Sequence, residues 1–188
     1  DADGEVVLVG GGDPTLSRTS PSQTYPGAPT MADLAGQVLA ALPAGGVLAQ
    51  GRATCPATTA ADNQAAAAAT NAQRRARGLA AVAPDPRLAK AAAAHACDMA
   101  RRGVLSHTGS NGSAPMQRAK AAGYAPRVIA ENVAAGPARL DQAMAMWMRS
   151  PPHLANIANA QVRHVGIGRA VGADGRTTYW TAVYAAPR

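Results

Sequence analysis

The sequence contains no phenylalanine, and large hydrophobic side chains of other kinds are few. Aromatic residues make up 3% of the 188 residues, whereas hydrophobic residues as a class make up 47%. Alanine therefore supplies much of the apolar surface, and we expect a thin, closely packed core. Aromatic rings dominate core energetics where they occur. All but one of them follow residue 123, so we expect the core to form around Tyr124, Trp147, Tyr179, Trp180 and Tyr184.

Long hydrophobic runs are also absent. A helix that spans a membrane needs about 20 consecutive apolar residues, and no stretch of about 18 strongly apolar residues occurs. Residues 34–49 are uncharged and weakly apolar, but Asp33 rather than a basic residue precedes them, which makes them a poor export signal. We therefore predict no transmembrane segment.

Acidic residues are scarcer than basic ones. Eighteen Lys and Arg against eleven Asp and Glu give a net charge of +7 and a pI near 10.2, which favours anionic partners. The basic residues are scattered, however, and several lie near predicted helix ends, where cations complement the helix dipole. No basic stripe alternates with aromatic side chains, so we do not expect nucleic-acid binding.

The chain has the length of one domain with some excess. Residues 1–54 are rich in Gly, Pro, Ser and Thr, which predicts a flexible N-terminal tail in which a short helix at 32–42 is possible. Residues 55–188 form the predicted domain. Capping residues, Pro and Gly delimit four helices there, at about 59–78, 85–103, 113–123 and 140–150. Residues 128–134 are strand-like, and 163–170 with 177–184 indicate an antiparallel hairpin. This order predicts an α+β fold.

Three polar residues stand out as candidates for chemistry, namely His107, Glu131 and His153. Glu131 is one of two glutamates in the chain, and it lies within the predicted strand, where a carboxylate is costly to bury unless a partner pairs with it. Two imidazoles and a carboxylate form the ligand set of many catalytic zinc sites. The three are far apart in sequence, so they form a site only if the fold gathers them; otherwise the histidines are structural.

Other residues are weaker candidates for a catalytic or binding role. His95 lies near the inner face of the second helix and is interpreted as a core histidine, and His164 at the start of a strand is interpreted as structural. Ser106 precedes His107, but neighbours in sequence rarely point the same way. Gly166 and Gly168 do not indicate a dinucleotide site, because a hairpin rather than a helix follows them.

Several short motifs occur in one order along residues 58–188, and together they are far more specific than any one of them. They are Leu105-Ser106-His107, Ala130-Glu131-Asn132-Val133-Ala134, the run from Trp147 through Ser150-Pro151-Pro152-His153 to Ile157, His164-Val165-Gly166-Ile167-Gly168, and Tyr179-Trp180, preceded by Asn71 with Arg74 and by Ala94-His95-Ala96-Cys97-Asp98-Met99. This pattern resembles bacterial members of the CAP superfamily, the SCP-like domains shared by cysteine-rich secretory proteins, antigen 5 and pathogenesis-related proteins.

The resemblance implies a three-layer α-β-α sandwich with a small antiparallel sheet between helices, in a secreted or periplasmic protein that we expect to be monomeric. It favours a disulfide between Cys55 and Cys97 over two buried thiols. It further implies that His107, Glu131 and His153 belong to the family's cleft tetrad of two histidines and two acidic residues around an open groove that sometimes holds zinc. Ser150 stands close to the place of the second acidic residue, and a hydroxyl neither carries that charge nor binds zinc as a carboxylate does.

Two functions follow from the resemblance, and a third from the tail. The first is a binding module for a small apolar ligand, a lipid or an envelope component, which the missing acidic residue favours. The alternative is a zinc-dependent hydrolase, in which His107 and His153 hold Zn²⁺ and Glu131 serves as the base toward its water. The third is a structural envelope protein tethered by residues 1–54.

Overall fold

The structure, a computed structural model, describes residues 6–9, 52–136 and 138–188. The short helix predicted at 32–42 lies outside these residues. The elements in chain order are β1 (Val6–Val9), α2 (Ala60–Arg75), β2 (Ala83–Pro84), α3 (Pro86–Arg102), α4 (Pro115–Ala121), β3 (Pro126–Ala135), α5 (Leu140–Arg149), α6 (Pro151–Ile157), β4 (His164–Val171) and β5 (Thr178–Pro187). No described helix is both long enough and apolar enough to span a bilayer.

The strands form one sheet in the order β1-β3-β5-β4-β2. β5 pairs antiparallel with both β3 and β4, which confirms the predicted strand and hairpin. The two edge strands run parallel to their neighbours, so the sheet is mixed rather than wholly antiparallel. Neither edge strand was predicted, since β2 has only two residues and β1 falls within the predicted tail. The domain boundary at 54/55 stays a prediction.

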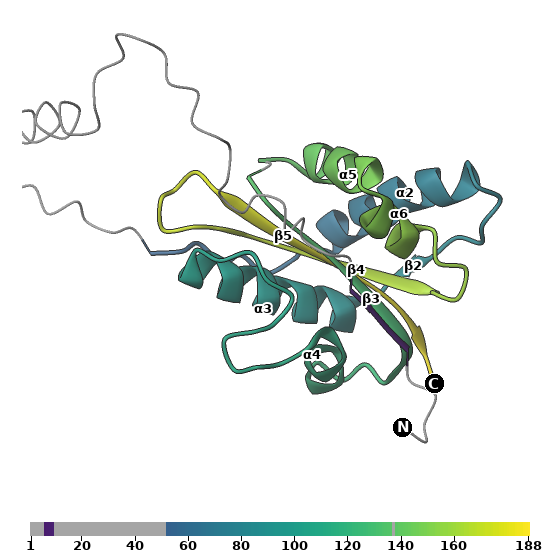
Figure 1. Cartoon of the computed structure of the whole chain (residues 1–188), viewed down its shortest axis with the longest axis horizontal. Helices are drawn as coiled ribbons and strands as arrows, with labels where there is room; N and C mark the ends of the chain where they lie inside the picture. Colours follow the sequence, from purple (N-terminus) through teal and green to yellow (C-terminus); the bar gives the residue numbers. More distant parts are fainter. Residues whose placement is uncertain (1–5, 10–51, 137) are drawn as a thin grey trace, which may run out of the picture. The chain divides into compact units, whose positions relative to one another are not determined.

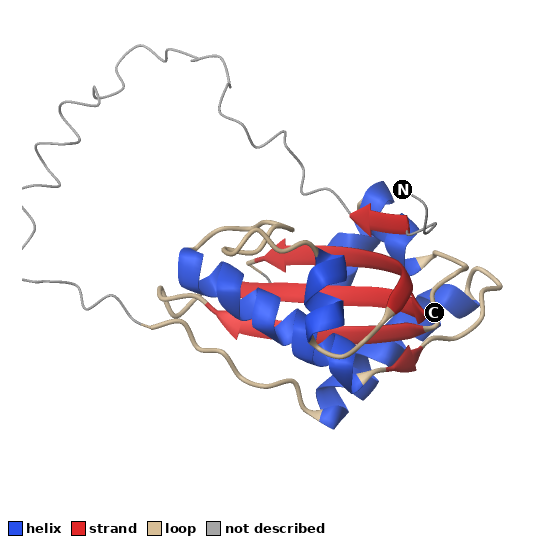
Figure 2. Cartoon of the chain, turned by 90° about the horizontal axis from the view of Figure 1, so that it is seen from below, coloured by secondary structure: helices blue, strands red, loops and turns tan. Residues whose placement is uncertain are grey.

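Helices cover both faces of the sheet, as Figures 1 and 2 show. α3 and α4 lie on one face, and α2, α5 and α6 lie on the other, which confirms the α+β three-layer sandwich. Alternation along β3 divides the core accordingly. Val128 and Ala130 pack with Trp147 of α5 and Ile157 of α6, whereas Ile129 packs with Leu88 of α3.

The helix boundaries follow from local chemistry. Thr59 and Asp62 form a capping box at the start of α2. Asp85 accepts hydrogen bonds from the first turn of α3, and Gly103, with φ of 65°, ends that helix in the left-handed conformation. The proline pair ends α5 as predicted. The same prolines then open α6, because proline is tolerated in the first turn of a helix.

Gly166 and Gly168 allow α3 to lie directly on β4. A Cβ atom at Gly166 would come within 2.2 Å of the backbone of Ala89, and one at Gly168 within 2.2 Å of the backbone of Ala93. The backbones thus approach more closely than any side chain would permit. This G-x-G pair serves the packing of α3 on β4.

Asn71 and Arg74 of α2 are structural. Asn71 exchanges hydrogen bonds of 2.9 and 2.8 Å with the backbone of Val82. The Arg74 guanidinium is fully buried and donates to the carbonyls of Ala80, Ile157 and Asn159 at 2.7 to 2.8 Å. Together they fasten α2 to the chain before β2 and to the end of α6.

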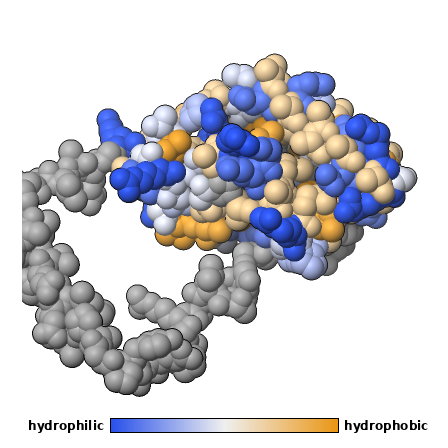
Figure 3. Space-filling view, turned by 90° about the horizontal axis from the view of Figure 1, so that it is seen from above, coloured by the Kyte–Doolittle hydropathy of each residue, from blue (hydrophilic) through white to orange (hydrophobic). Residues whose placement is uncertain are grey.

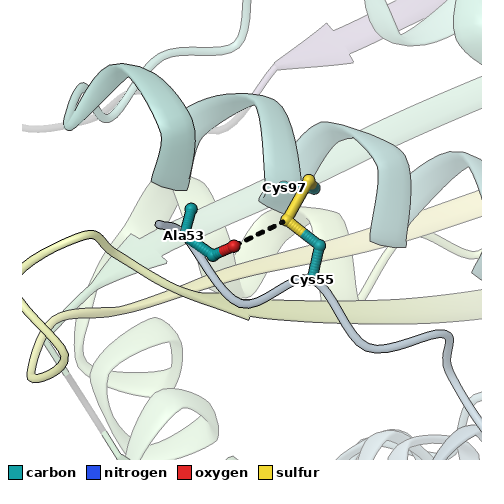
Figure 4. Close-up of a disulfide and its surroundings, with 3 residues drawn as sticks. All are labelled: Ala53, Cys55 and Cys97. Carbon is teal, nitrogen blue, oxygen red and sulfur yellow. Dashed lines mark hydrogen bonds between the residues drawn. A yellow bond between two sulfur atoms is a disulfide. The ribbon is translucent and has the colours of Figure 1, made fainter. Parts of the chain in front are cut away.

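Cys55 and Cys97 form a disulfide, with their Cα atoms 5.2 Å apart. The bond joins the segment that precedes α2 to the middle of α3 (Figure 4). It confirms the pairing that the family resemblance implied and excludes two free thiols. A cross-link over a sequence separation of 42 stabilises the folded state by about 4 kcal/mol in the chain-entropy model.

Candidate functional site

Glu131 of β3 is fully buried and lies at the centre of a charged cluster. Arg118 of α4 places Nη2 3.0 Å from Oε1 and 2.7 Å from Oε2 of this carboxylate. Nδ1 of His107, in the loop after α3, lies 2.9 Å from Oε1. The fold thus provides the partners that a buried carboxylate requires.

His107 contacts Glu131 from the rim of the cluster, with 17% of its side chain exposed. A carboxylate paired with a guanidinium acts as an acceptor, so the network assigns the proton of this contact to Nδ1 of His107. The predicted proximity of His107 and Glu131 is therefore a direct hydrogen bond in the structure. The catalytic and metal-binding roles assigned to the two residues stay predictions.

His95 of α3 adjoins the contact between His107 and Glu131 and is 1% exposed. Its Nε2 lies 2.8 Å from the carbonyl oxygen of Ser106 and 3.8 Å from Oε1 of Glu131. Burial lowers the pKa of His95, and the attraction of Glu131 only partly opposes this. The interpretation of His95 as a core histidine is confirmed, and the structure adds that it adjoins the charged cluster.

His153 of α6 is half-buried, and its Nε2 is buried without a hydrogen-bond partner. Burial lowers the pKa of His153, and the charge of nearby His107 lowers it further. Its carbonyl oxygen accepts from Nδ2 of Asn132 at 3.1 Å, and Asn156 donates to Oδ1 of Asn132 at 2.8 Å. These amides fasten the start of α6 to β3. His153 therefore lies close to His107, but no contact joins its ring to Glu131.

Ser150 occupies the junction between α5 and α6, where its side chain makes no capping hydrogen bond. His164 begins β4, and its Nδ1 lies 2.7 Å from the hydroxyl of Tyr124, which confirms its structural interpretation. Burial raises the pKa of Tyr124 to about 12, so its hydroxyl keeps its proton.

Arg118 was missed by the sequence interpretation. It lies on a helix of seven residues, and Nη1 also donates to the carbonyl oxygen of Ser113 at 2.5 Å. The available signal was indirect: a glutamate among apolar strand residues needs a cation, and Arg118 lies on the predicted helix between His107 and Glu131. Sequence spacing alone does not distinguish it from Lys120 or Arg127.

The donor set does not fit a catalytic zinc site with three protein ligands. In residues 52–136 and 138–188, no three His, Cys, Asp or Glu side chains are arranged to hold a metal ion. Both oxygens of Glu131 are engaged by Arg118, and one also by His107. A catalytic zinc site requires three protein groups besides its open position.

A separate pocket of about 410 Å³ lies among residues 56–59, the first turns of α2, the start of α5 and strands β4 and β5. Its apolar lining includes Leu140, Ile167 and Trp180, and its polar residues are Thr58, Thr59, Asp62, Arg139 and Arg169. Neither His107, Glu131 nor His153 lines it. On the face of the molecule that bears α2, α5 and α6, strongly hydrophobic side chains gather only in small patches (Figure 3).

The model of the CAP family, described as the cysteine-rich secretory protein family, matches residues 67–184. The chain belongs to this family. YkwD of Bacillus subtilis, a curated relative described as uncharacterized, is 31% identical over 99 residues, which are 53% of this CAP chain and 38% of that protein. The chain thus matches well under half the length of this relative.

Two solved structures share the CAP fold. An outer surface protein of Borrelia burgdorferi has a TM-score of 0.62 at 21% identity, over 70% of this chain and 96% of that one. An extracellular protein of Bacillus anthracis that contains an SCP domain has a TM-score of 0.59 at 23% identity, over 68% of this chain and 44% of that one. At these identities the likeness concerns the fold alone.

Proposed function

We propose that this CAP domain is exported and binds a small apolar ligand in the pocket beside Trp180. The observation that carries the proposal is the pocket itself, which has a volume of about 410 Å³ and apolar walls around Leu140, Ile167 and Trp180. Ligand pockets typically have this size and this kind of lining. Arg139 and Arg169 add polar groups that orient a ligand. The disulfide supports export, since such bonds persist in oxidising compartments.

The charged cluster supports binding over catalysis. Glu131 holds Arg118 and His107 within hydrogen-bond distance, so its carboxylate is already engaged in the resting protein. A general base must reach the proton of its substrate or water. The unpaired Nε2 of His153 beside His107 is the one observation that favours the zinc-dependent hydrolase. Without a third ligand in the described part of the chain, we rank that hydrolase second.

The test compares two variants of the same helix. Ala65 of α2 is exposed and lines the pocket, so Ala65→Trp fills the cavity without disturbing the core. Ala68 is also exposed but lies outside the pocket lining, and Ala68→Trp serves as the control. Binding of Nile red, a neutral apolar dye, and mass spectrometry of lipid extracts are the measurements. We expect Ala65→Trp to lose dye and co-purified ligand and Ala68→Trp to keep both. Equal retention by both variants would refute the pocket as the binding site.

A further inference from the structure

One wall of the apolar pocket is a segment outside every helix and strand. Residues 56–59 all line the pocket beside Trp180. Three of them, residues 57–59, also line a second hollow of about 270 Å³, which α2 and α3 complete with Asn63, Ala89 and Lys90. The segment therefore separates two cavities, and any displacement of it changes both.

Few contacts hold this wall in place. Within residues 52–136 and 138–188, no backbone-to-backbone hydrogen bond involves residues 55–58. Before the wall, Thr54 pairs with Val171 through hydrogen bonds of 2.8 and 2.9 Å. After it, Thr59 caps α2. Between these two ends, the ties are the hydroxyl of Thr58, which donates to the carbonyl of Ile167 at 2.6 Å, and the disulfide from Cys55 to Cys97.

The two cysteines differ in their surroundings. Cys97 is 9% exposed and lies on α3 beside Ala96 and Met99, both fully buried. Cys55 is only partly buried, in a segment whose neighbours Thr54 and Pro56 are exposed. Breaking the bond thus leaves the α3 side anchored in the core. On the other side, Ala53 and Cys55 still pack against the cluster around Cys97, but among the residues that the structure describes, 56–58 keep only the hydrogen bond from Thr58 to Ile167.

We propose that the Cys55–Cys97 disulfide is a redox-controlled clamp on the wall of the apolar pocket. This inference rests on the proposed function. In the oxidised chain the clamp holds residues 56–59 against α3 and β4, and the pocket is formed. A dithiol reductant breaks the bond: its two sulfur atoms join as a new disulfide, and its two electrons and two protons convert Cys55 and Cys97 into thiols.

Reduction lets the wall leave its position by local opening while the sheet and helices stay folded. The ligand-competent state is then populated only in part, and the apparent affinity falls by that fraction. The chemical consequence is release of an apolar ligand when the protein passes from an oxidising to a reducing environment.

Nile red titrations of the full chain test the clamp, with the oxidised protein, the protein in excess dithiothreitol and the Cys55→Ser plus Cys97→Ser variant. We expect the dye to bind at least about tenfold more weakly to the reduced chain, and the variant to bind weakly whether or not reductant is present. Amide hydrogen exchange gives a readout that needs no ligand. The amides of Thr54 and Thr59, which are hydrogen-bonded at the two ends of the wall, should exchange faster after reduction, while Ala92 and Ala96 of α3 stay protected.

Each other outcome has a definite meaning. Equal dye affinity of the oxidised and reduced chains overturns the clamp and leaves the proposed function intact. Loss of protection in α3 together with Thr54 and Thr59 also overturns it, because reduction then unfolds the whole domain. No dye binding by the oxidised chain refutes the proposed function and, with it, control of binding by the disulfide.

Discussion

Arg118 of α4 contacts both carboxylate oxygens of Glu131, at 3.0 and 2.7 Å, and so links a helix on one face of the sheet to strand β3 within it (Figure 1). Glu131 is fully buried, and the Arg118 side chain is only 10% exposed. The charge of Glu131 is therefore balanced by Arg118 rather than by water. Replacing Arg118 alone should lower the free energy of unfolding far more than replacing both residues together.

Arg118→Met should destabilise the domain by about 3 to 5 kcal/mol, because it leaves a buried carboxylate without its cation. The double variant Arg118→Met plus Glu131→Met should recover most of this loss, since an apolar pair of similar volume needs no charge partner. Urea unfolding monitored by tryptophan fluorescence measures both. A double variant no more stable than the single one would show that the pair contributes little beyond packing.

The stability of the domain should fall as the pH falls below about 6.5, the ordinary value for histidine. Burial lowers the pKa of both His95 and His153 in the folded chain. The unfolded chain therefore takes up protons first, and stability rises with pH wherever the unfolded state binds more of them. The loss should extend from about 6.5 down to the lowered pKa values. Unfolding midpoints at a series of pH values from neutral to mildly acidic measure it, and a flat or inverted profile would contradict it.

Replacing His153 separates the two contributions. His153→Gln removes one of the two rings whose pKa burial lowers, so the slope of stability against pH should decrease, while His95 still contributes to it. The surface variant Ala68→Trp is the control, since it removes no titrating group and should leave the slope unchanged.

Gly168→Ala should lower the free energy of unfolding by about 1 to 3 kcal/mol or more, because the new methyl group meets the backbone of α3 at 2.2 Å. Backbone atoms cannot move aside as the end of a flexible side chain does, so α3 must shift from β4. Gly175→Ala provides a comparison: it has φ of 65° but no atom within 4 Å of the added carbon, so its cost comes only from the left-handed backbone, about 1 kcal/mol. Thermal unfolding of both variants measures the difference.

Zinc content should be substoichiometric in protein purified without chelator, because the described residues supply no third ligand beside His107 and His153. The double variant His107→Ala plus His153→Ala should then contain no less zinc than the unmodified chain. Elemental analysis decides this. One zinc per chain that disappears in the double variant would restore the hydrolase as the leading function.

Local sequence signals determined most of the secondary structure. Thr59, Asp85 and Gly103 act on backbone groups a few residues away, so the limits of α2 and α3 follow from short-range chemistry. The hairpin of β4 and β5 follows likewise from alternation around a turn. Edge strand β2, two residues long, carries no such signal, because its pairing with β4 depends on a distant part of the chain.

The sequence likewise predicted only part of the candidate site. Composition and residue type by themselves established that Glu131 would need a partner, and the ordered motifs indicated the family. Only the tertiary structure decided which partner it has, because Arg118, His107 and His95 meet Glu131 through the packing of α3 and α4 on the sheet. The packing of α2 and α5 on β4 and β5 formed the pocket beside Trp180 from segments far apart in sequence, and no local pattern predicts a pocket built from long-range contacts.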